Sequence, residues 1–268
     1  MRHDDIRKII MIKITVLGCG TSQGVPVIGC GCEVCKSKDP RDKRTRTSII
    51  VENESTAVCI DCGPDFRQQM LREGISHLDA VLITHHHKDH IGGLDDLRPL
   101  EFRQNISMPI YASEDAQEEI KREYSYAFVE KNELYPGAPT FDLHTIKDYQ
   151  PITINDLIFT PVPMLHLKML CYAFRIGRFA YVTDLSYISE EGIKAMRGVD
   201  YLIIEALHHE KHYSHINLEQ AIALSQRIGA QNTWFTHCSH HIGLAAEVNK
   251  TLPKGMELAY DGLQINIE

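Results

Sequence analysis

The chain has 268 residues, and its 36 acidic and 28 basic side chains give a formal net charge of −8. Hydrophobic residues make up 43% and charged residues 24%, which is typical of a soluble globular protein and excludes a disordered chain. The negative charge argues against a duplex or tRNA binder, because such proteins carry a broad basic face. No apolar run approaches the ~18–20 residues that span a bilayer, so we expect no membrane partner.

Residues 1–10 contain Asp4 and Asp5 and no apolar stretch of the kind found in signal peptides. We therefore expect a cytoplasmic protein. Met11 directly precedes the first strand-like run, so we interpret residues 1–10 as an N-terminal extension. No linker rich in Pro, Gly or Ser divides the remainder, which predicts a single domain over residues 11–268.

Short β-branched runs bounded by Gly, Asp, Asn or Pro predict the strands of this domain. In chain order they are Ile12–Leu17, Ser48–Val51, Val58–Ile60, Ala80–Ile83, Leu157–Thr160, Leu170–Phe174, Phe179–Val182, Tyr201–Ile204 and Leu263–Ile267. Helical patterns lie at Phe66–Glu73, Glu114–Tyr124, Glu190–Met196, Leu218–Ile228 and Leu244–Leu252. Strands come in pairs in the first half and alternate with helices in the second. This order predicts an α/β sandwich in which two sheets lie between outer helices.

Two local patterns add detail to this prediction. Asn217 is a predicted N-cap with Gln220 three residues later, and Gly229 is the matching C-cap. The segment Tyr124–Tyr149 is aromatic, contains Pro and has no clear period. We interpret it as an active-site flap or an inter-subunit contact.

The strongest chemical signal directly follows the strand Ala80–Ile83. His85, His87, Asp89 and His90 form the pattern His-x-His-x-Asp-His. Imidazole and carboxylate groups are ligands for Zn²⁺, Mn²⁺ or Fe²⁺, and residues at a strand end are held rigidly. A solvated polar loop is the alternative interpretation. The density of ligand-type residues favours a metal site.

A second signal is the cluster Cys30, Cys32 and Cys35, spaced as Cys-x-Cys-x-x-Cys. Three thiols supply three corners of the tetrahedron that structural zinc prefers. We expect His240 to be the fourth ligand, with Cys238 and His241 as alternatives. A disulfide with one free thiol, or a redox site, would also explain the spacing.

Together these motifs resemble the metallo-β-lactamase-fold hydrolase superfamily over nearly the whole chain. That family places an Asp after an early strand, then His-x-His-x-Asp-His, then a His, an Asp and a final His at later strand ends. The matching residues are Asp61 in Ile60-Asp61-Cys62-Gly63-Pro64, His166 in Pro163-Met164-Leu165-His166, Asp184 in Tyr181-Val182-Thr183-Asp184, and His237 in Trp234-Phe235-Thr236-His237.

The resemblance implies an αββα fold with two mixed sheets flanked by helices, and it assigns the ligands. His85, His87 and His166 would bind a first divalent metal, while Asp89, His90 and His237 would bind a second. Asp184 would bridge the two. Asp61 would accept a proton from a ligand imidazole and fix its tautomer. We therefore expect two catalytic metals, Mn or Zn, and one structural Zn.

Within the superfamily, the stretch Gly18-Cys19-Gly20-Thr21-Ser22-Gln23-Gly24-Val25-Pro26-Val27 before the cysteines, and Ser214-His215-Ile216-Asn217-Leu218 later, narrow the resemblance. They are similar to phosphoribosyl 1,2-cyclic phosphate phosphodiesterases of the carbon–phosphorus lyase pathway and their close relatives. The resemblance implies a homodimer and a place for His215 near the phosphate. A leaving alkoxide needs a proton, and His215 is the expected donor. The stretch of residues 40–48 is basic, and within it Arg44 or Arg46 is expected to pair with a substrate phosphate.

These observations predict a metal-dependent phosphodiesterase that hydrolyses a small cyclic phosphate ester, of the phosphoribosyl or cyclic nucleotide type, with water activated between two metals. An RNA 3′-end-processing nuclease or a thioester hydrolase could use the same metal core. A non-enzymatic alternative is a nucleic-acid-binding protein built on the cysteine cluster as a zinc knuckle. The complete second set of ligands and the net charge argue against nucleic acid as a partner.

Overall fold

The computed structural model describes residues 11–130 and 135–267, so residues 1–10, the predicted extension, lie outside the described part. The strands of the first sheet are β1 (Ile12–Gly18), β2 (Ser48–Glu52), β3 (Ala57–Ile60), β4 (Ala80–Leu82), β5 (Met108–Ala112), β6 (Phe141–Thr145) and β14 (Gln264–Ile267). Those of the second sheet are β7 (Ile152–Ile154), β8 (Leu157–His166), β9 (Met169–Ile176), β10 (Phe179–Val182), β11 (Tyr201–Glu205), β12 (Asn232–Thr236) and β13 (Met256–Leu258). The helices are α1 (Glu33–Lys36), α2 (Phe66–Glu73), α3 (Lys88–Ile91), α4 (Arg98–Gln104), α5 (Glu114–Glu123), α6 (Glu190–Met196), α7 (Leu218–Ile228) and α8 (Ala245–Val248).

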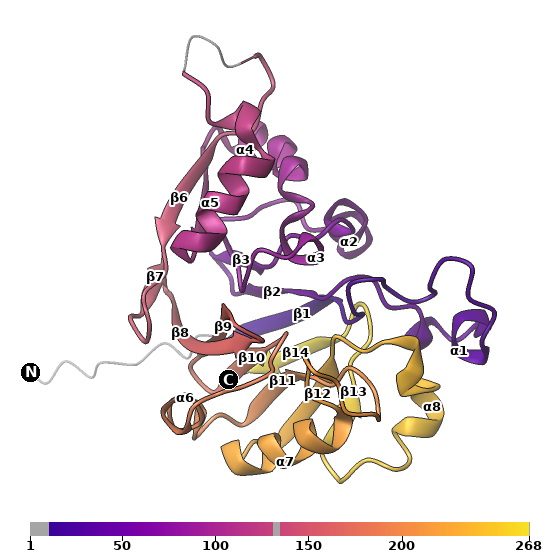
Figure 1. The fold of residues 1–268 in the computed structure, drawn as a ribbon. Helices are drawn as coiled ribbons and strands as arrows, with labels where there is room; N and C mark the ends of the chain where they lie inside the picture. The colour runs from indigo at the N-terminus through magenta and orange to yellow at the C-terminus, as the bar shows by residue number, and fades with distance from the viewer. Residues whose placement is uncertain (1–10, 131–134, 268) are drawn as a thin grey trace, which may run out of the picture.

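Each sheet has seven strands, in the orders β14-β1-β2-β3-β4-β5-β6 and β13-β12-β11-β10-β9-β8-β7. Both sheets are mixed, because antiparallel pairs such as β1–β2 are followed by parallel pairs such as β3–β4. In Figure 1 most of the first half of the chain, in purple and magenta, forms the upper part of the molecule. The second half, in orange and yellow, forms the lower part.

Three apolar layers hold these elements together. Val16 and Ile60 of the first sheet and Phe174 of the second are 0% exposed and belong to one cluster between the sheets. Phe66 of α2 packs in a second cluster against the outer face of the first sheet. Leu224 of α7 packs in a third cluster against the second sheet. The layer order is therefore α/β/β/α, and the predicted fold class is confirmed.

The predicted caps of α7 are present. The Asn217 side chain accepts from the Gln220 N–H at 2.9 Å, and the Gln220 side chain accepts from the Asn217 N–H at 3.0 Å. Gly229 ends the helix at φ 89°, a left-handed conformation that glycine adopts without steric cost. None of the helices in the described residues has the length and apolar character that crossing a bilayer requires.

Several elements differ from those predicted. Strands β5, β6, β7, β12 and β13 were not predicted from the sequence. Strand β6 lies inside Tyr124–Tyr149, so the interpretation of that segment as irregular is wrong over Phe141–Thr145, where the chain forms the edge strand beside β5. The helix predicted over Leu244–Leu252 is only Ala245–Val248, because Asn249 and Thr251 are weak helix formers in the predicted second half.

Candidate metal centres and active site

The strand ends that carry the predicted site residues meet at one edge of the sandwich. Strands β3 and β4 are parallel with Ile60 opposite Leu82, so the residues that follow them lie side by side. Strands β10, β11 and β12 are also parallel, with Val182, Ile204 and Phe235 in register. Residues after parallel strands emerge at the same edge, where a rigid scaffold positions them.

Three of these residues have an unusual backbone conformation. The angle φ is 66° at Asp61, 57° at Asp184 and 55° at His237, in the left-handed region that residues other than glycine rarely adopt. This conformation costs on the order of 1–3 kcal/mol and is concentrated at functional sites, where surrounding contacts maintain it. Here it turns the chain sharply just after a strand.

The first group of candidate ligands consists of three histidines. Ring nitrogens of His85, His87 and His166 all lie within 4.8 Å of one another. His85 Nε2 and His87 Nδ1 are 3.0 Å apart, and His166, the last residue of β8, comes from the other sheet. Burial lowers the pKa of His85 and of His166, which keeps both rings in the neutral form that binds a metal. The structure brings together the residues predicted for the first metal.

The second group consists of Asp89, His90, Asp184 and His237, again with ligand atoms within 4.8 Å of one another. Asp184 Oδ2 lies 3.1 Å from His90 Nε2. Its Oδ1 lies 3.4 Å from His237 Nε2 and 4.0 Å from His85 Nε2. One carboxylate thus faces a ligand of each group, which is the arrangement predicted for a bridging Asp184.

Buried nitrogens of the second group fit a cation. His90 Nε2 and both ring nitrogens of His237 are buried and have no hydrogen-bond partner within residues 11–130 and 135–267. Leaving such a group unpaired costs about 1–3 kcal/mol. The carboxylates of Asp89 and Asp184 lie beside these nitrogens. A divalent cation satisfies both kinds of group at once, because imidazole and carboxylate are its usual ligands.

Asp61 is a buried carboxylate behind the ligands. Its Oδ2 accepts a hydrogen bond from His90 Nδ1 at 2.7 Å, and its Oδ1 accepts from the Thr84 backbone N–H at 2.8 Å. The Thr84 hydroxyl donates to Asp61 at 2.9 Å and lies 3.0 Å from His85 Nδ1. These contacts favour the proton on Nδ1 of both rings and leave Nε2 for a metal. Asp61 is therefore placed to orient the imidazoles of His85 and His90, and the positioning role that the resemblance implied stays a prediction.

The residues predicted to bind structural zinc lie close together. His240 follows the candidate ligand His237 by three residues in the same loop. His240 Nδ1 lies 3.3, 3.4 and 3.5 Å from the sulfurs of Cys30, Cys32 and Cys35. A tetrahedral site with Zn–S and Zn–N bonds of ordinary length has an N–S separation of about 3.5 Å. The Cys35 N–H donates to Cys32 Sγ, and this contact, followed by that with His240, lowers the pKa of Cys32 to about 6. These residues therefore fit a zinc ion.

The alternatives for this cluster do not match the geometry. All eight cysteines are free in the structure, so a disulfide within the cluster is absent. Cys238 is buried elsewhere, with its Sγ 3.4 Å from the Thr236 carbonyl oxygen. Among the described residues, His241 belongs to no group of candidate metal ligands.

His215 lies beside a member of each ligand group, with its ring centroid 4.7 Å from that of His166 and 4.9 Å from that of His237, and it is paired with Glu205, which was not predicted. Its Nδ1 is 2.8 Å from Glu205 Oε2 and 3.8 Å from Asp184 Oδ1. Glu205 is fully buried at the end of β11, and its Oε1 accepts from the backbone N–H of Leu185 and of Ile216. Burial raises the pKa of Glu205 and lowers that of His215 to about 4, because it disfavours a separated carboxylate and imidazolium. The sequence did contain a signal for Glu205, because this residue lies at the end of a predicted strand, as several other site residues do.

The placement of Arg44 corrects the expectation that it contacts substrate. Its side chain is 0% exposed and pairs with Asp42 Oδ1 at 3.3 Å. It also donates to the carbonyl oxygens of Ser239 and Gly243, so it fastens the loop that carries His240. A guanidinium enclosed in this way cannot reach a substrate.

Arg46 lies nearer the site. Its Nη1 is 2.9 Å from Asp65 Oδ1, and its Nε donates to the Ser22 carbonyl oxygen. Ser22 lines the cavity that also contains the candidate ligands His87, Asp89, His166, Asp184 and His237. The predicted contact of Arg46 with substrate stays a prediction.

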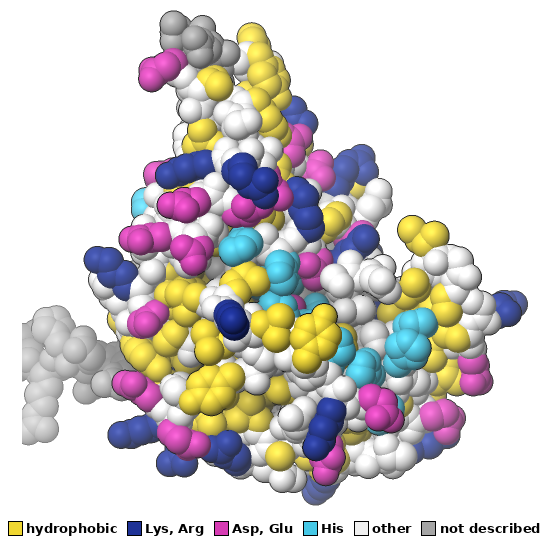
Figure 2. All heavy atoms as spheres, in the orientation of Figure 1, with side chains coloured by type: hydrophobic (Ala, Val, Ile, Leu, Met, Phe, Trp, Pro, Cys, Tyr) yellow, Lys and Arg dark blue, Asp and Glu magenta, His cyan; other side chains and the backbone are white. Residues whose placement is uncertain are grey.

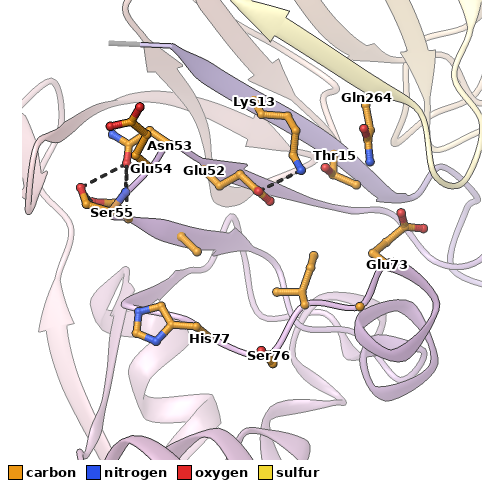
Figure 3. Close-up of a pocket in the computed structure, with 14 residues that line it drawn as sticks. Lys13, Thr15, Glu52, Asn53, Glu54, Ser55, Glu73, Ser76, His77 and Gln264 are labelled. Atoms are coloured by element: carbon orange, nitrogen blue, oxygen red, sulfur yellow. Dashed lines mark hydrogen bonds and ion pairs between the residues drawn. The ribbon is translucent and has the colours of Figure 1, made fainter. Parts of the chain in front are cut away.

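These candidate ligands lie in a cavity of about 300 Å³, and Leu167, His212, Tyr213 and Ser214 also line it. Figure 2 shows histidine side chains gathered across the middle of the visible face, between the upper and lower parts of the molecule. A different polar groove of about 390 Å³ lies beside the C-terminal end of α2, with the Lys13–Glu52 ion pair at 2.9 Å in its wall (Figure 3). It contains none of the ligand groups found in the described part of the chain.

Comparisons with known proteins agree with this geometry. A family model described as a β-lactamase superfamily domain matches residues 56–238. A crystal structure titled as a new diphosphatase from the PhnP family is 40% identical, covers 96% of this chain and 97% of that chain, and has a TM-score of 0.89. Coenzyme PQQ synthesis protein B of Methylorubrum populi is 36% identical over 218 residues, 72% of each protein.

A further relative is a Porphyromonas gingivalis protein named octanoyltransferase, which is 40% identical over 259 residues. The match covers 96% of this chain but 52% of that protein, so this chain spans about half the length of that relative. The fold implies that a divalent metal is bound. With the family model matching more than half of its length, the chain belongs to the metallo-β-lactamase superfamily.

Proposed function

We propose that this protein is a metal-dependent hydrolase of small phosphate compounds, and that a cyclic phosphodiester is its substrate. The observation that carries the proposal is the Glu205–His215 pair beside two complete ligand groups. His85, His87 and His166 would hold one cation, and Asp89, His90 and His237 the other, with Asp184 between them. Two such cations supply Lewis-acid stabilisation of the charge that develops on phosphate oxygens and acidify water.

The side chains of the protein complete this reaction. Opening a cyclic phosphodiester leaves an alkoxide, which needs a proton. His215 lines the cavity, and its Nδ1 contacts Glu205 rather than solvent. Glu205 Oε2 and His215 Nδ1 share one proton. Whether that proton is on the carboxyl or on the imidazole, Nε2 of His215 stays protonated. His215 then donates from Nε2, while Glu205 keeps the ring oriented.

A diphosphate is the second candidate substrate. The PhnP-family structure that is 40% identical to this chain is titled a diphosphatase. Cleavage of a phosphoanhydride uses the same stabilisation of phosphate oxygens, but its leaving group is a phosphate that needs less help from an acid. The two substrates therefore make different demands on His215.

Large nucleic acids fit the site less well. Lys and Arg side chains on the face shown in Figure 2 are interspersed with Asp and Glu and form no continuous basic surface. A nuclease of this fold would need such a surface to hold the RNA backbone. We therefore propose a small phosphorylated molecule as the partner.

The test is a substrate panel assayed with protein loaded with Mn²⁺ or Zn²⁺. It contains phosphoribosyl 1,2-cyclic phosphate, a 2′,3′-cyclic nucleotide, a nitrophenyl phosphodiester, a nucleoside diphosphate and an octanoyl thioester. We expect hydrolysis of the phosphorus compounds and none of the thioester. Turnover of the thioester alone would contradict the proposal.

His215→Ala tests whether His215 donates a proton to the leaving group. It should lower kcat for the cyclic ester by about 10²–10⁴-fold, the usual size of general acid catalysis. The loss should be much smaller for the nitrophenyl diester, because nitrophenolate leaves without a proton. An equal loss on both substrates would show that His215 positions the phosphate instead.

A further inference from the structure

One side chain of the cavity has no role in the reaction proposed above. His212 lies in the loop between β11 and α7, and it lines the cavity together with His166, Asp184 and His215. Its ring centroid is 5.4 Å from that of His215, whose Nδ1 is 3.8 Å from Asp184. His212 is therefore one imidazole further from the ligand groups than the proposed proton donor.

The hydrogen bonds of His212 determine which of its nitrogens carries the proton. The Ser214 backbone N–H, which can only donate, points to His212 Nδ1 at 3.4 Å. The Ser214 hydroxyl lies 3.0 Å from the same nitrogen. Nδ1 is thus an acceptor, and the proton of the neutral ring is on Nε2. Within the described residues no hydrogen-bond partner engages Nε2, so its N–H is available to a ligand.

Ser214 also links this ring to the metal ligands. The Ser214 carbonyl oxygen accepts from His166 Nδ1 at 3.0 Å, which leaves His166 Nε2 for a metal. One buried residue, 6% exposed, therefore orients both His166 and His212. The donor at His212 is held at a fixed place relative to the first ligand group.

Arg44 and Arg46, the two arginines predicted to bind substrate, are already paired with carboxylates and are therefore less available than His212 to a second anionic group. Arg44 is enclosed in its contacts with Asp42, and Arg46 is paired with Asp65. His212 is different, because it lines the cavity that contains the candidate ligands and its hydrogen bonds to Ser214 engage only Nδ1.

We propose that His212 binds a second phosphate group of the substrate, attached beyond the phosphorus that reacts at the ligand groups. This inference rests on the proposed function, because it places the reacting phosphate at the cations that residues such as His85, His166 and Asp184 would hold. A second phosphate attached to the same small molecule reaches outward past His215, where the Nε2–H of His212 donates to a phosphate oxygen. Hydrogen bonds to an ionised acceptor are the strong kind.

Two substitutions separate this donor from the structural role of the ring. His212→Asn places an amide oxygen near the position of Nδ1, so it can still accept from Ser214, but it offers no donor at Nε2. His212→Gln places an amide N–H near the position of Nε2. Lys211→Ala, at an exposed position in the same loop, is the matched control.

The experiment measures binding of inorganic orthophosphate and inorganic diphosphate to Mn²⁺-loaded protein by calorimetry, with metal content determined afterwards. We expect wild type to bind diphosphate more tightly than orthophosphate. His212→Asn should weaken diphosphate binding by about ten- to a hundredfold and leave orthophosphate binding unchanged. His212→Gln should recover most of the loss, and Lys211→Ala should match wild type. Removal of metal by diphosphate would affect all variants alike.

Unchanged diphosphate affinity in His212→Asn would overturn the inference, as would an equal loss for both anions. Turnover of the substrate panel is measured separately on the same preparations. If no phosphorus compound is hydrolysed but the binding pattern holds, the proposed function fails and the phosphate site stands. If hydrolysis occurs but the binding pattern is absent, only the site fails.

Discussion

A single carboxylate connects the two sides of the candidate active site. Glu205 Oε1 accepts the backbone N–H that directly follows Asp184, and its Oε2 contacts His215. It also lies 3.8 Å from His237 Nδ1. Glu205 thereby fixes the positions of the bridging carboxylate and the proposed proton donor relative to each other.

Glu205→Gln should therefore reduce activity without unfolding the protein. The amide retains an oxygen for the N–H groups of Leu185 and Ile216, but it cannot share a proton with His215. We expect kcat for a cyclic ester to fall by about 10²-fold or more. Burial raises the pKa of Glu205, so the protonated carboxyl stabilises the folded state at low pH and this contribution is lost as pH rises through the raised pKa. Gln is neutral at every pH, so we expect the Tm of Glu205→Gln at pH 7 to be no lower than that of wild type.

The double variant with His215→Ala decides between positioning and independent action. Residues that act as one unit are strongly non-additive. Glu205→Gln with His215→Ala should thus lose little more activity than His215→Ala alone. Multiplicative losses, or a large decrease in Tm of Glu205→Gln, would contradict the assignment.

The candidate ligands could be predicted because His85, His87, Asp89 and His90 form a dense motif soon after β4, and the others lie at or just after the ends of β8, β10 and β12. His166 and Asp184 needed the family pattern, since a lone residue of either type at a strand end has many ordinary roles. The partner of His215 could not be predicted, because Glu205 becomes a partner only through the register of β11 between β10 and β12. Arg44 was misassigned because a basic stretch in a sequence does not reveal which side chain is enclosed.

At the scale of elements, a short loop at each end of the chain forms the cysteine cluster. Helix α1 has only four residues, too few to be stable alone. Its residues Val34 and Cys35 form a small apolar cluster with Val25, with Leu244 packed against it. A zinc ion would therefore supply much of what holds this loop to the loop that carries His237 and His240.

Cys32→Ser should release one zinc per chain and lower Tm. Loss of a ligand weakens the attachment between the two loops, so we expect a decrease of about 5 °C or more. Zinc content by metal analysis and Tm by calorimetry check this. Glu33→Ala, at the next and exposed position, should keep both values. Full zinc occupancy in Cys32→Ser would show that the cluster is not a zinc site.

The elements that were missed share a physical reason. Strand β5 contains Pro109, which cannot donate a ladder hydrogen bond, and β6 is an edge strand with a half-exposed pattern and no apolar run. Strand β13 has only three residues. Such strands form because a neighbouring strand offers backbone hydrogen bonds, which no local pattern records. The buried central strands β2, β3, β4 and β10 were predictable from sequence alone.

For the molecule as a whole, each of the three ligand sets predicted from the sequence takes residues from both halves of the chain. The first joins His85 and His87, after β4, to His166 at the end of β8. The second joins Asp89 and His90 to residues that follow β10 and β12. The cysteine set joins the loop before β2 to His240, near the C-terminal end. Metals bound at these sites would cross-link the two sheets in addition to the apolar layer between them.

Metal binding should therefore stabilise the fold at two separable sites. A ligand at a hundred times its Kd adds about 2.7 kcal/mol to the stability of the folded state, which raises Tm by about 5–10 °C for a protein of this size. Mn²⁺ prefers oxygen and nitrogen ligands, whereas thiolates select Zn²⁺. Adding Mn²⁺ to metal-free protein should raise Tm of wild type and of Cys32→Ser, but not of Asp184→Ala, which lacks the carboxylate shared by both catalytic positions. One equivalent of Zn²⁺ should instead stabilise Asp184→Ala and fail to restore Cys32→Ser fully. Calorimetry of the three proteins measures this crossed pattern, and an equal response of Asp184→Ala and wild type to Mn²⁺ would refute the assignment of a metal-bridging role to Asp184.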